Sequence, residues 1–184
     1  MRVLRKSAGF LFDSLFVRFQ SFYALNKAAV VWLLFYYKGV YMYFLKSENN
    51  FDAAHFLKGY DGKCSNLHGH CWRVVAEIQG EKLSEEKQTR GMLTDFSDLK
   101  HALNELCDEF DHSLIYEKDS LRPSTLQAFS DESFKISEVS FRPTAENFAK
   151  YFYEKLSKKG FAVHRIEVYE TAKNCAAYEE DESC

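Results

Sequence analysis

The segment from residue 51 to residue 78 constrains the fold more than any other part of the chain. Its residues alternate in polarity, which is typical of β-strands, where successive side chains point to opposite faces. In the first half, the alternate positions Phe51, Ala53 and His55 lie on one face of the strand. In the second half, His68 and His70 share a face with the apolar residues Trp72 and Val74. Two glycines between these halves allow the chain to turn back. The pattern therefore predicts a β-hairpin with three imidazoles on its core-facing side.

His55, His68 and His70 are candidate metal ligands. Neutral imidazoles that converge from neighbouring strands suit Zn²⁺, with one coordination position left for water or substrate. A single His-x-His motif is a weak signal, but three core-facing histidines within sixteen residues, with Cys64 nearby, favour a metal site. Cys64 can be a fourth ligand in a closed Cys-His₃ structural site, or a free acid, base or nucleophile beside the metal. The spacing leaves both alternatives open.

Composition bounds the class of protein. A chain of 184 residues with 46% hydrophobic residues suffices for one domain with a core. A net charge of −3 gives no general case for nucleic-acid binding. Five cysteines at irregular spacings indicate a reducing cytoplasm rather than a disulfide framework. Those expected to be ordinary thiols are Cys71, Cys107, Cys175 and Cys184.

Residues 1–41 differ from the rest of the chain. They hold six Lys or Arg against one Asp, and 11 of the 30 aromatic residues. Their longest uncharged run has ten residues, against the roughly 20 needed to span a bilayer, so no membrane association is expected. A signal peptide is disfavoured because no small-residue cleavage site follows. We predict that 1–41 is an N-terminal extension outside the functional domain, or a mis-assigned start before Met42, and that 42–184 is the functional domain.

The rest of the chain alternates between helical and strand-like patterns. Helical spacing begins after Asp95, a predicted N-cap, and continues to Phe110. A second helix begins after the predicted N-cap Thr144 and ends at Gly160. Further elements are expected as strands at 41–45, 134–141 and 162–170, and as a short helix at 121–129 within an insertion covering 120–140. This order predicts an α+β domain with two main helices packed on one face of an antiparallel sheet.

Asp111 and His112 directly follow the first predicted helix. An adjacent Asp–His pair at a helix end is commonly a solvated loop pair. The functional interpretation is that His112 shuttles a proton while Asp111 fixes its tautomer. The sequence alone leaves both interpretations open.

Three further polar residues are candidates for substrate binding. Glu170 continues an apolar strand face, where a carboxylate is costly to bury unless it is paired. It can reach solvent at the strand end, or it can anchor a ligand with two adjacent N–H donors, such as the edge of a pterin or guanine. Thr144 and Glu146 lie at a helix start, where their residue types are favoured for structural reasons. We keep both as weaker candidates for substrate binding.

Six motifs together resemble the 6-pyruvoyltetrahydropterin synthase superfamily, and within it the bacterial 6-carboxytetrahydropterin synthases of the queuosine pathway. They are Phe51-Asp-Ala-Ala-His55, Cys64-Ser-Asn-Leu-His-Gly-His70, Gly91-Met-Leu-Thr-Asp-Phe96, Asp111-His112, Pro143-Thr-Ala-Glu-Asn147 and Glu170-Thr171. The resemblance extends from Met42 to about Tyr178. The gap of three residues between Cys64 and His68 is similar to that of the carboxy-type enzymes.

The resemblance implies a role for each matching residue: His55, His68 and His70 as ligands of one zinc ion per subunit, Cys64 as the catalytic thiol, Asp111 and His112 as a proton relay, and Glu170 as a pterin anchor that also takes part in the relay. The resemblance also implies the tunnelling fold, in which sheets from several subunits close a barrel. Two trimers commonly stack to a hexamer, and the site lies between subunits. The extension before Met42 matches nothing in the family pattern, and the insertion at 120–140 is longer than in the shortest members.

The implied substrate is 7,8-dihydroneopterin triphosphate, a small-molecule pterin. The implied products are 6-carboxy-5,6,7,8-tetrahydropterin, acetaldehyde and triphosphate. One alternative is formation of 6-pyruvoyltetrahydropterin, in which triphosphate leaves without carbon–carbon cleavage. Another is a non-enzymatic pterin- or purine-binding protein with a structural zinc.

Overall fold

The computed structural model describes residues 41–180. The chain divides into two units between Tyr41 and Met42, and only the second is considered below. The predicted extension at 1–41 therefore lies outside the described residues, apart from Tyr41. Within residues 41–180, every helix is too short or too polar to cross a membrane.

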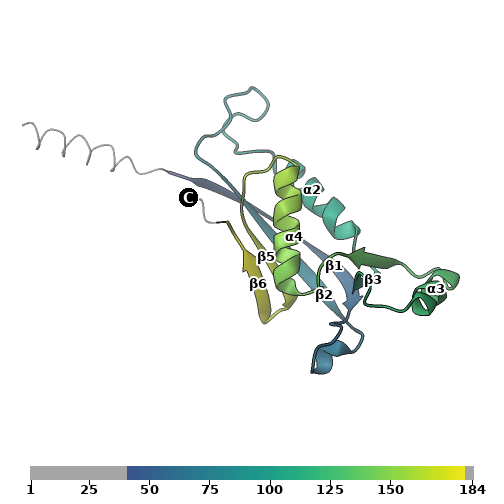
Figure 1. The fold of residues 1–184 in the computed structure, drawn as a ribbon. Helices are drawn as coiled ribbons and strands as arrows, with labels where there is room; N and C mark the ends of the chain where they lie inside the picture. Colours follow the sequence, from purple (N-terminus) through teal and green to yellow (C-terminus); the bar gives the residue numbers. More distant parts are fainter. Residues whose placement is uncertain (1–40, 181–184) are drawn as a thin grey trace, which may run out of the picture. The chain divides into compact units, whose positions relative to one another are not determined.

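A six-stranded sheet forms the centre of the described domain, in the order β4-β3-β1-β2-β5-β6 (Figure 1). The strands are β1 (Tyr43–His55), β2 (His68–Gly80), β3 (Ser113–Glu117), β4 (Ile136–Val139), β5 (Val163–Thr171) and β6 (Asn174–Tyr178). β1, β2, β5 and β6 pair antiparallel, and for the first three of these strands the sequence predicts this pairing. β3 and β4 extend this sheet with parallel pairing, so the whole sheet is mixed, and the prediction of a purely antiparallel sheet is wrong for these two strands.

The β1–β2 hairpin confirms the alternation in the sequence. The strand expected at 41–45 and the row ending at His55 form one continuous strand of 13 residues. Its register pairs His55 with His68, and Phe51 with Trp72. Phe51 and Trp72 are almost completely buried, and their rings stack 6.0 Å apart. This apolar layer fixes which strand face is buried, and hence where the imidazoles point.

Two main helices, α2 (Phe96–Asp108) and α4 (Ala145–Lys158), cover one face of the sheet (Figure 1). Both predicted N-caps are confirmed. The Asp95 side chain accepts a hydrogen bond from the backbone N–H of Ser97, and the Thr144 hydroxyl accepts one from that of Asn147. The buried stripe of α4 consists of Phe148, Ala149, Phe152 and Leu156. The α+β architecture is therefore as expected.

The insertion forms α3 (Pro123–Asp131) and β4, close to the predicted helix and strand. The sequence patterns do not predict β3 and β6. β3 is buried at four of its five positions and shows no alternation, because a strand inside a parallel arrangement is covered on both faces. β6 has the sequence Asn-Cys-Ala-Ala-Tyr, with little β-propensity. A short 3₁₀-helix, η1 (Lys63–Ser65), lies in the loop between β1 and β2.

Candidate metal centre and adjoining cavity

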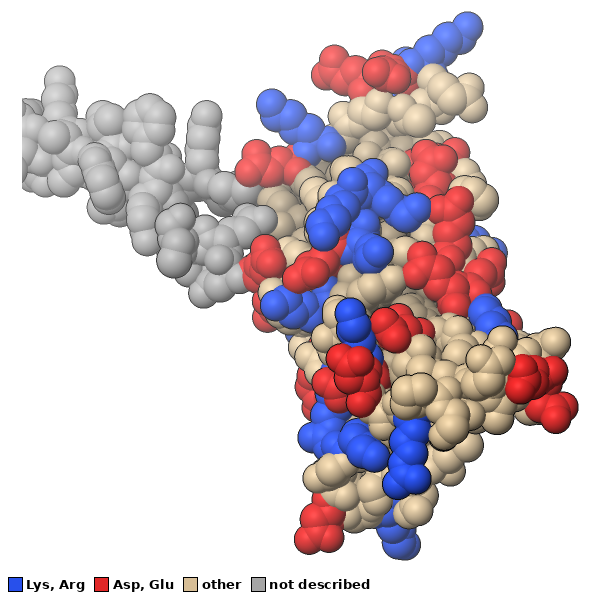
Figure 2. Space-filling view, turned by 45° about the vertical axis from the view of Figure 1, so that its right-hand side comes forward, with Lys and Arg blue, Asp and Glu red and all other residues tan. Residues whose placement is uncertain are grey.

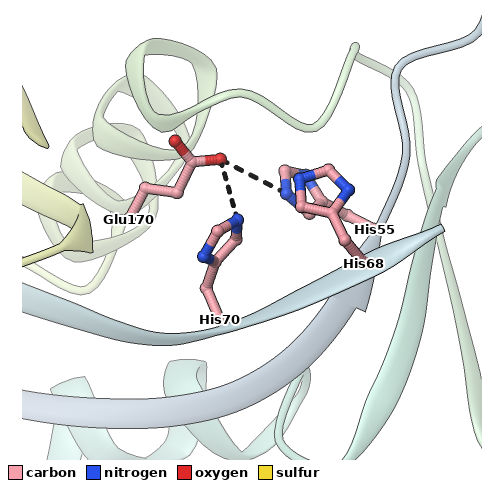
Figure 3. Close-up of side chains that lie close together, drawn as sticks. All are labelled: His55, His68, His70 and Glu170. Carbon is pink, nitrogen blue, oxygen red and sulfur yellow. Dashed lines mark ion pairs between the residues drawn. The ribbon is translucent and has the colours of Figure 1, made fainter. Parts of the chain in front are cut away.

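The three predicted ligands meet at one end of the β1–β2 hairpin. His55 is the last residue of β1, and His68 and His70 lie at the start of β2 (Figure 3). The ring centroids of His55 and His68 are 4.4 Å apart, and those of His68 and His70 are 5.0 Å apart. The predicted convergence of these imidazoles is therefore present.

Backbone carbonyl groups orient two of the rings. Nδ1 of His55 lies 2.8 Å from the carbonyl oxygen of Pro143, and Nδ1 of His68 lies 2.8 Å from that of Asn66. A carbonyl oxygen can only accept a hydrogen bond, so Nδ1 is the donor in both rings. Each neutral ring therefore has a free lone pair on Nε2, as in histidines whose ring orientation is fixed for metal binding.

Glu170 places a carboxylate oxygen among these rings. Its Oε1 lies 3.3 Å from Nε2 of His55 and 3.4 Å from Nε2 of His70 (Figure 3). These two nitrogen atoms are buried, and neither has a hydrogen-bond partner among the described residues. A nitrogen lone pair and a carboxylate oxygen repel each other unless a proton or a cation lies between them. The donor atoms of His55, His68, His70 and Glu170 all lie within 4.8 Å of one another, so these residues can hold a metal ion.

Burial keeps the imidazoles in the form that binds metals. Desolvation is the largest cause that lowers the pKa of His55 below its ordinary value, and the hydrogen bond with Pro143 opposes it. Desolvation also lowers the pKa of His70, opposed by the charge of Glu170. The neutral rings are therefore favoured, and a neutral ring is required for coordination.

A cavity of about 270 Å³ adjoins His55, whereas His70 lines a second cavity. Its walls include His55, Glu170 and Cys64, the last of which lies half-buried on η1. Cys64 is not among the residues whose donor atoms converge within 4.8 Å. This arrangement argues against the closed Cys-His₃ alternative, and places the thiol on the cavity that His55 and Glu170 also line.

The start of α4 also borders this cavity. Thr144 and Glu146 both line it, as does Tyr60. The Thr144 hydroxyl already accepts the N-cap hydrogen bond from Asn147 at 3.4 Å. Tyr60 and the carbonyl group of Pro143 were not predicted as site residues. The only sequence signal for Pro143 is its place in the Pro-Thr-Ala-Glu-Asn motif.

Asp111 and His112 form the predicted pair, but away from Cys64. Nδ1 of His112 lies 2.7 Å from Oδ2 of Asp111. The His112 side chain is 80% exposed and lines a second cavity of about 530 Å³, which does not include Cys64. The backbone N–H of Asp52 donates to Asp111 and is the main cause that lowers the pKa of this carboxyl group, followed by His112. Within one chain, the structure therefore does not bring the pair together with the thiol.

The fold and the site define a class: an α+β protein with three histidines on a β-hairpin that can hold a metal ion beside an open cavity. The sequence model of the family described as "6-pyruvoyl tetrahydropterin synthase" matches residues 44–181. The chain belongs to the 6-pyruvoyl tetrahydropterin synthase family.

Two relatives show how far the sequence similarity extends. The chain is 34% identical over 142 residues to a 6-carboxy-5,6,7,8-tetrahydropterin synthase of Haemophilus influenzae, covering 76% of this chain and 100% of that protein. It is 32% identical over 139 residues to a protein of the same name from Synechocystis, covering 74% of this chain and 93% of that protein.

Solved structures support the fold. An uncharacterized protein of Wolinella succinogenes superposes with a TM-score of 0.64 at 23% identity, covering 77% of this chain and 99% of the other. The 6-pyruvoyl tetrahydropterin synthase of Plasmodium vivax gives a TM-score of 0.56 at 18% identity, with the same coverage. At these identities, the similarity concerns the fold alone.

Proposed function

We propose that this protein is a zinc-dependent lyase that converts 7,8-dihydroneopterin triphosphate and one water molecule to 6-carboxy-5,6,7,8-tetrahydropterin, acetaldehyde and triphosphate. The main support is the convergence of donor atoms from His55, His68, His70 and Glu170, together with a cavity that His55 and Glu170 line and that Cys64 also lines. The names of the relatives that align with nearly all of residues 44–181 agree with this chemistry. The product is a precursor for queuosine and other 7-deazapurines, so the protein acts in a tRNA modification pathway.

His55, His68 and His70 would hold one zinc ion per subunit. When bound there, zinc supplies Lewis acidity toward a substrate oxygen, which eases proton removal at the neighbouring carbon. Glu170 lines the same cavity and accepts two N–H donors from the pterin edge through its carboxylate. Its distance from two imidazoles is also compatible with a direct part in holding the metal. Thr144 and Glu146 contribute to the substrate-binding wall.

Cys64 acts as the first acid–base group in this scheme, because it faces the cavity and stays outside the metal-binding set. It takes the proton from the substrate side chain. His112, oriented by the carboxylate of Asp111, transfers the second proton. Triphosphate leaves by elimination. One water molecule then adds at the side-chain carbon that becomes the carboxylate, and cleavage of the carbon–carbon bond releases the remaining two carbons as acetaldehyde.

A neighbouring subunit would complete the site. Cys64 and His112 line different cavities, so a relay that uses both needs the thiol of one chain and the imidazole of another. The cavity beside Cys64, about 270 Å³, is also below the roughly 300–1,000 Å³ typical of ligand pockets. We therefore propose a homo-oligomer, with a hexamer built from two trimers as the expected form.

The surface agrees with a small-molecule substrate. Figure 2 shows Lys and Arg interspersed with Asp and Glu on the face in view. This face therefore lacks the continuous basic patch that nucleic-acid binding uses. Irregularly spaced cysteines support action in the reducing cytoplasm. The working domain is proposed to be 42–184, in agreement with the family match at 44–181.

The test is turnover of 7,8-dihydroneopterin triphosphate by the zinc-loaded protein, followed by mass spectrometry of the pterin and assay of acetaldehyde. The expected result is 6-carboxytetrahydropterin with one acetaldehyde per triphosphate. A pyruvoyl product without acetaldehyde would instead assign the pyruvoyl-type reaction. Tight pterin binding without turnover would indicate a binding protein.

A further inference from the structure

The end of α2 is held by a lysine from the inserted segment. Nζ of Lys135 donates hydrogen bonds to the backbone carbonyl oxygens of Asp108 and Asp111, both at 2.9 Å. The last carbonyl groups of a helix have no partner within the helix, and a cation near them is favourable. Lys135 therefore clamps the turn that leads from α2 into the Asp111–His112 pair.

Two serines complete this clamp. The Ser113 hydroxyl donates to the carbonyl oxygen of Phe110 at 2.6 Å. The Ser137 hydroxyl, with one proton, lies between two acceptors, the carbonyl oxygen of Glu109 at 3.2 Å and Oγ of Ser113 at 3.0 Å. Four successive carbonyl groups, from residue 108 to residue 111, thus each lie within hydrogen-bonding distance of a side-chain donor. Lys135 directly precedes β4 and Ser137 lies within it, so three of these four hydrogen bonds come from the insertion.

The turn needs this support because its geometry is unusual. His112 has a φ of 53°, in the left-handed region that few non-glycine residues adopt. Its backbone N–H donates to the carbonyl oxygen of Asp52 at 2.7 Å, and the N–H of Asp52 donates to Asp111 at 2.9 Å. These two hydrogen bonds attach the turn to β1, while Lys135 attaches it to the end of α2. Together they determine the direction in which the His112 ring leaves the backbone.

We propose that Lys135 is a positioning residue for proton transfer by His112: it acts through the carbonyl groups of Asp108 and Asp111 and keeps the Asp111–His112 pair in its reactive orientation. The inference rests on the proposed function, in which His112 transfers a proton. It assigns the inserted segment a role in catalysis that requires no contact with substrate. Lys135 also lines the cavity of His112, so the test must separate positioning from direct binding of a substrate phosphate.

The experiment compares Lys135→Met and Lys135→Arg in the full-length, zinc-loaded protein. The expected kcat of Lys135→Met is lower by about tenfold or more, which is part of the roughly 10²- to 10⁴-fold that a positioned acid or base supplies. KM for dihydroneopterin triphosphate and zinc content should remain within about twofold of wild type, because a group that acts only on the chemical step changes kcat and leaves substrate binding intact. Lys135→Arg should recover most of kcat, because a guanidinium group can also donate to two carbonyl oxygens.

Hydrogen–deuterium exchange gives a readout that does not depend on activity. In Lys135→Met, the peptide containing the His112 amide should exchange faster, while peptides from the middle of β1 and β2 remain unchanged. The milder variant Ser137→Ala should shift both exchange and kcat in the same direction by a smaller amount, and it keeps the test valid if Lys135→Met does not fold. The control is Lys150→Met, which removes an exposed lysine paired with Glu154 on α4 and should match wild type.

Three results would overturn the proposal: a wild-type kcat in Lys135→Met, a raised KM with unchanged kcat, or a lower kcat with unchanged exchange at His112. The second result would instead indicate that Lys135 binds the substrate directly. Absence of turnover in the wild-type protein would reject the proposed function, whereas the exchange comparison would still decide whether Lys135 holds the turn.

Discussion

Oε1 of Glu170 lies 3.3 Å from Nε2 of His55, although neither atom has a proton to donate when Nδ1 of His55 is bonded to Pro143. The carboxylate is thus directed at a position suited to a cation or to the N–H groups of a ligand. These two roles give different results on mutation.

Glu170→Gln tests the anchor role. The amide keeps the size of the side chain but loses the charge and replaces one acceptor oxygen with a donor, so the affinity for a pterin should fall by about 10- to 100-fold. Zinc content, measured by mass spectrometry of the metal, should be unchanged. Normal substrate affinity would contradict the anchor role, and loss of zinc would assign Glu170 to the metal.

Cys64→Ala tests the role of the thiol. We expect the protein to keep its zinc and its fold, because Cys64 lies outside the converging donor atoms, and to lose about 10²- to 10⁴-fold in kcat. Cys64→Ser is the matched variant, and it should also be impaired because a hydroxyl group ionises far less readily than a thiol. Release of zinc and unfolding of the hairpin in Cys64→Ala would support the closed structural site.

Mixed oligomers test whether the site is shared. Cys64→Ala and His112→Ala should each be inactive, but co-refolding equal amounts should restore activity at about a quarter of the sites if subunits assemble at random. The matched control mixes Cys64→Ala with Glu170→Gln. Because both residues line the same cavity, this mixture should show no more activity than the Glu170→Gln protein alone. Equal recovery in the two mixtures, or none in either, would reject a relay between chains.

The metal-free protein should lose stability in mildly acidic solution. Burial lowers the folded-state pKa of His55 and His70, so below about pH 6.5 the unfolded chain binds more protons at these positions than the folded chain. The contribution of these two residues to the free energy of unfolding should therefore be fully present above this pH and decrease as pH falls below it. Urea unfolding with a chelator at pH 8 and pH 5.5 measures the difference.

The matched variants for this measurement are His55→Gln and His101→Gln. The first removes a buried imidazole and should weaken the pH dependence. The second removes a ring whose side chain is 78% exposed on α2 and should leave the dependence intact. Identical urea midpoints at both pH values in the wild-type protein would contradict the role of burial.

The sequence was sufficient to predict the β1–β2 hairpin and the convergence of His55, His68 and His70. An alternating row has a period of two residues, so it determines both the strand and the side on which each residue lies. The N-caps Asp95 and Thr144 were also predictable, because capping depends on a side chain and an N–H group two or three residues apart.

Contacts between distant segments were not predictable from these patterns. The carbonyl group that orients His55 comes from Pro143, 88 residues further along the chain. The amide and carbonyl partners of the Asp111–His112 pair belong to Asp52, 59 residues from Asp111. Such hydrogen bonds use backbone groups, which every residue has, so no residue type marks them in the sequence.

The pairing of His55 with His68 limits how this chain can diverge in evolution. Substitutions along β2 leave its side chains on their faces, but inserting one residue between His70 and Trp72 would turn the imidazoles away from the apolar layer that orients them. Relatives that keep the chemistry are therefore expected to differ in length in the connecting loops, and not within this part of the strand.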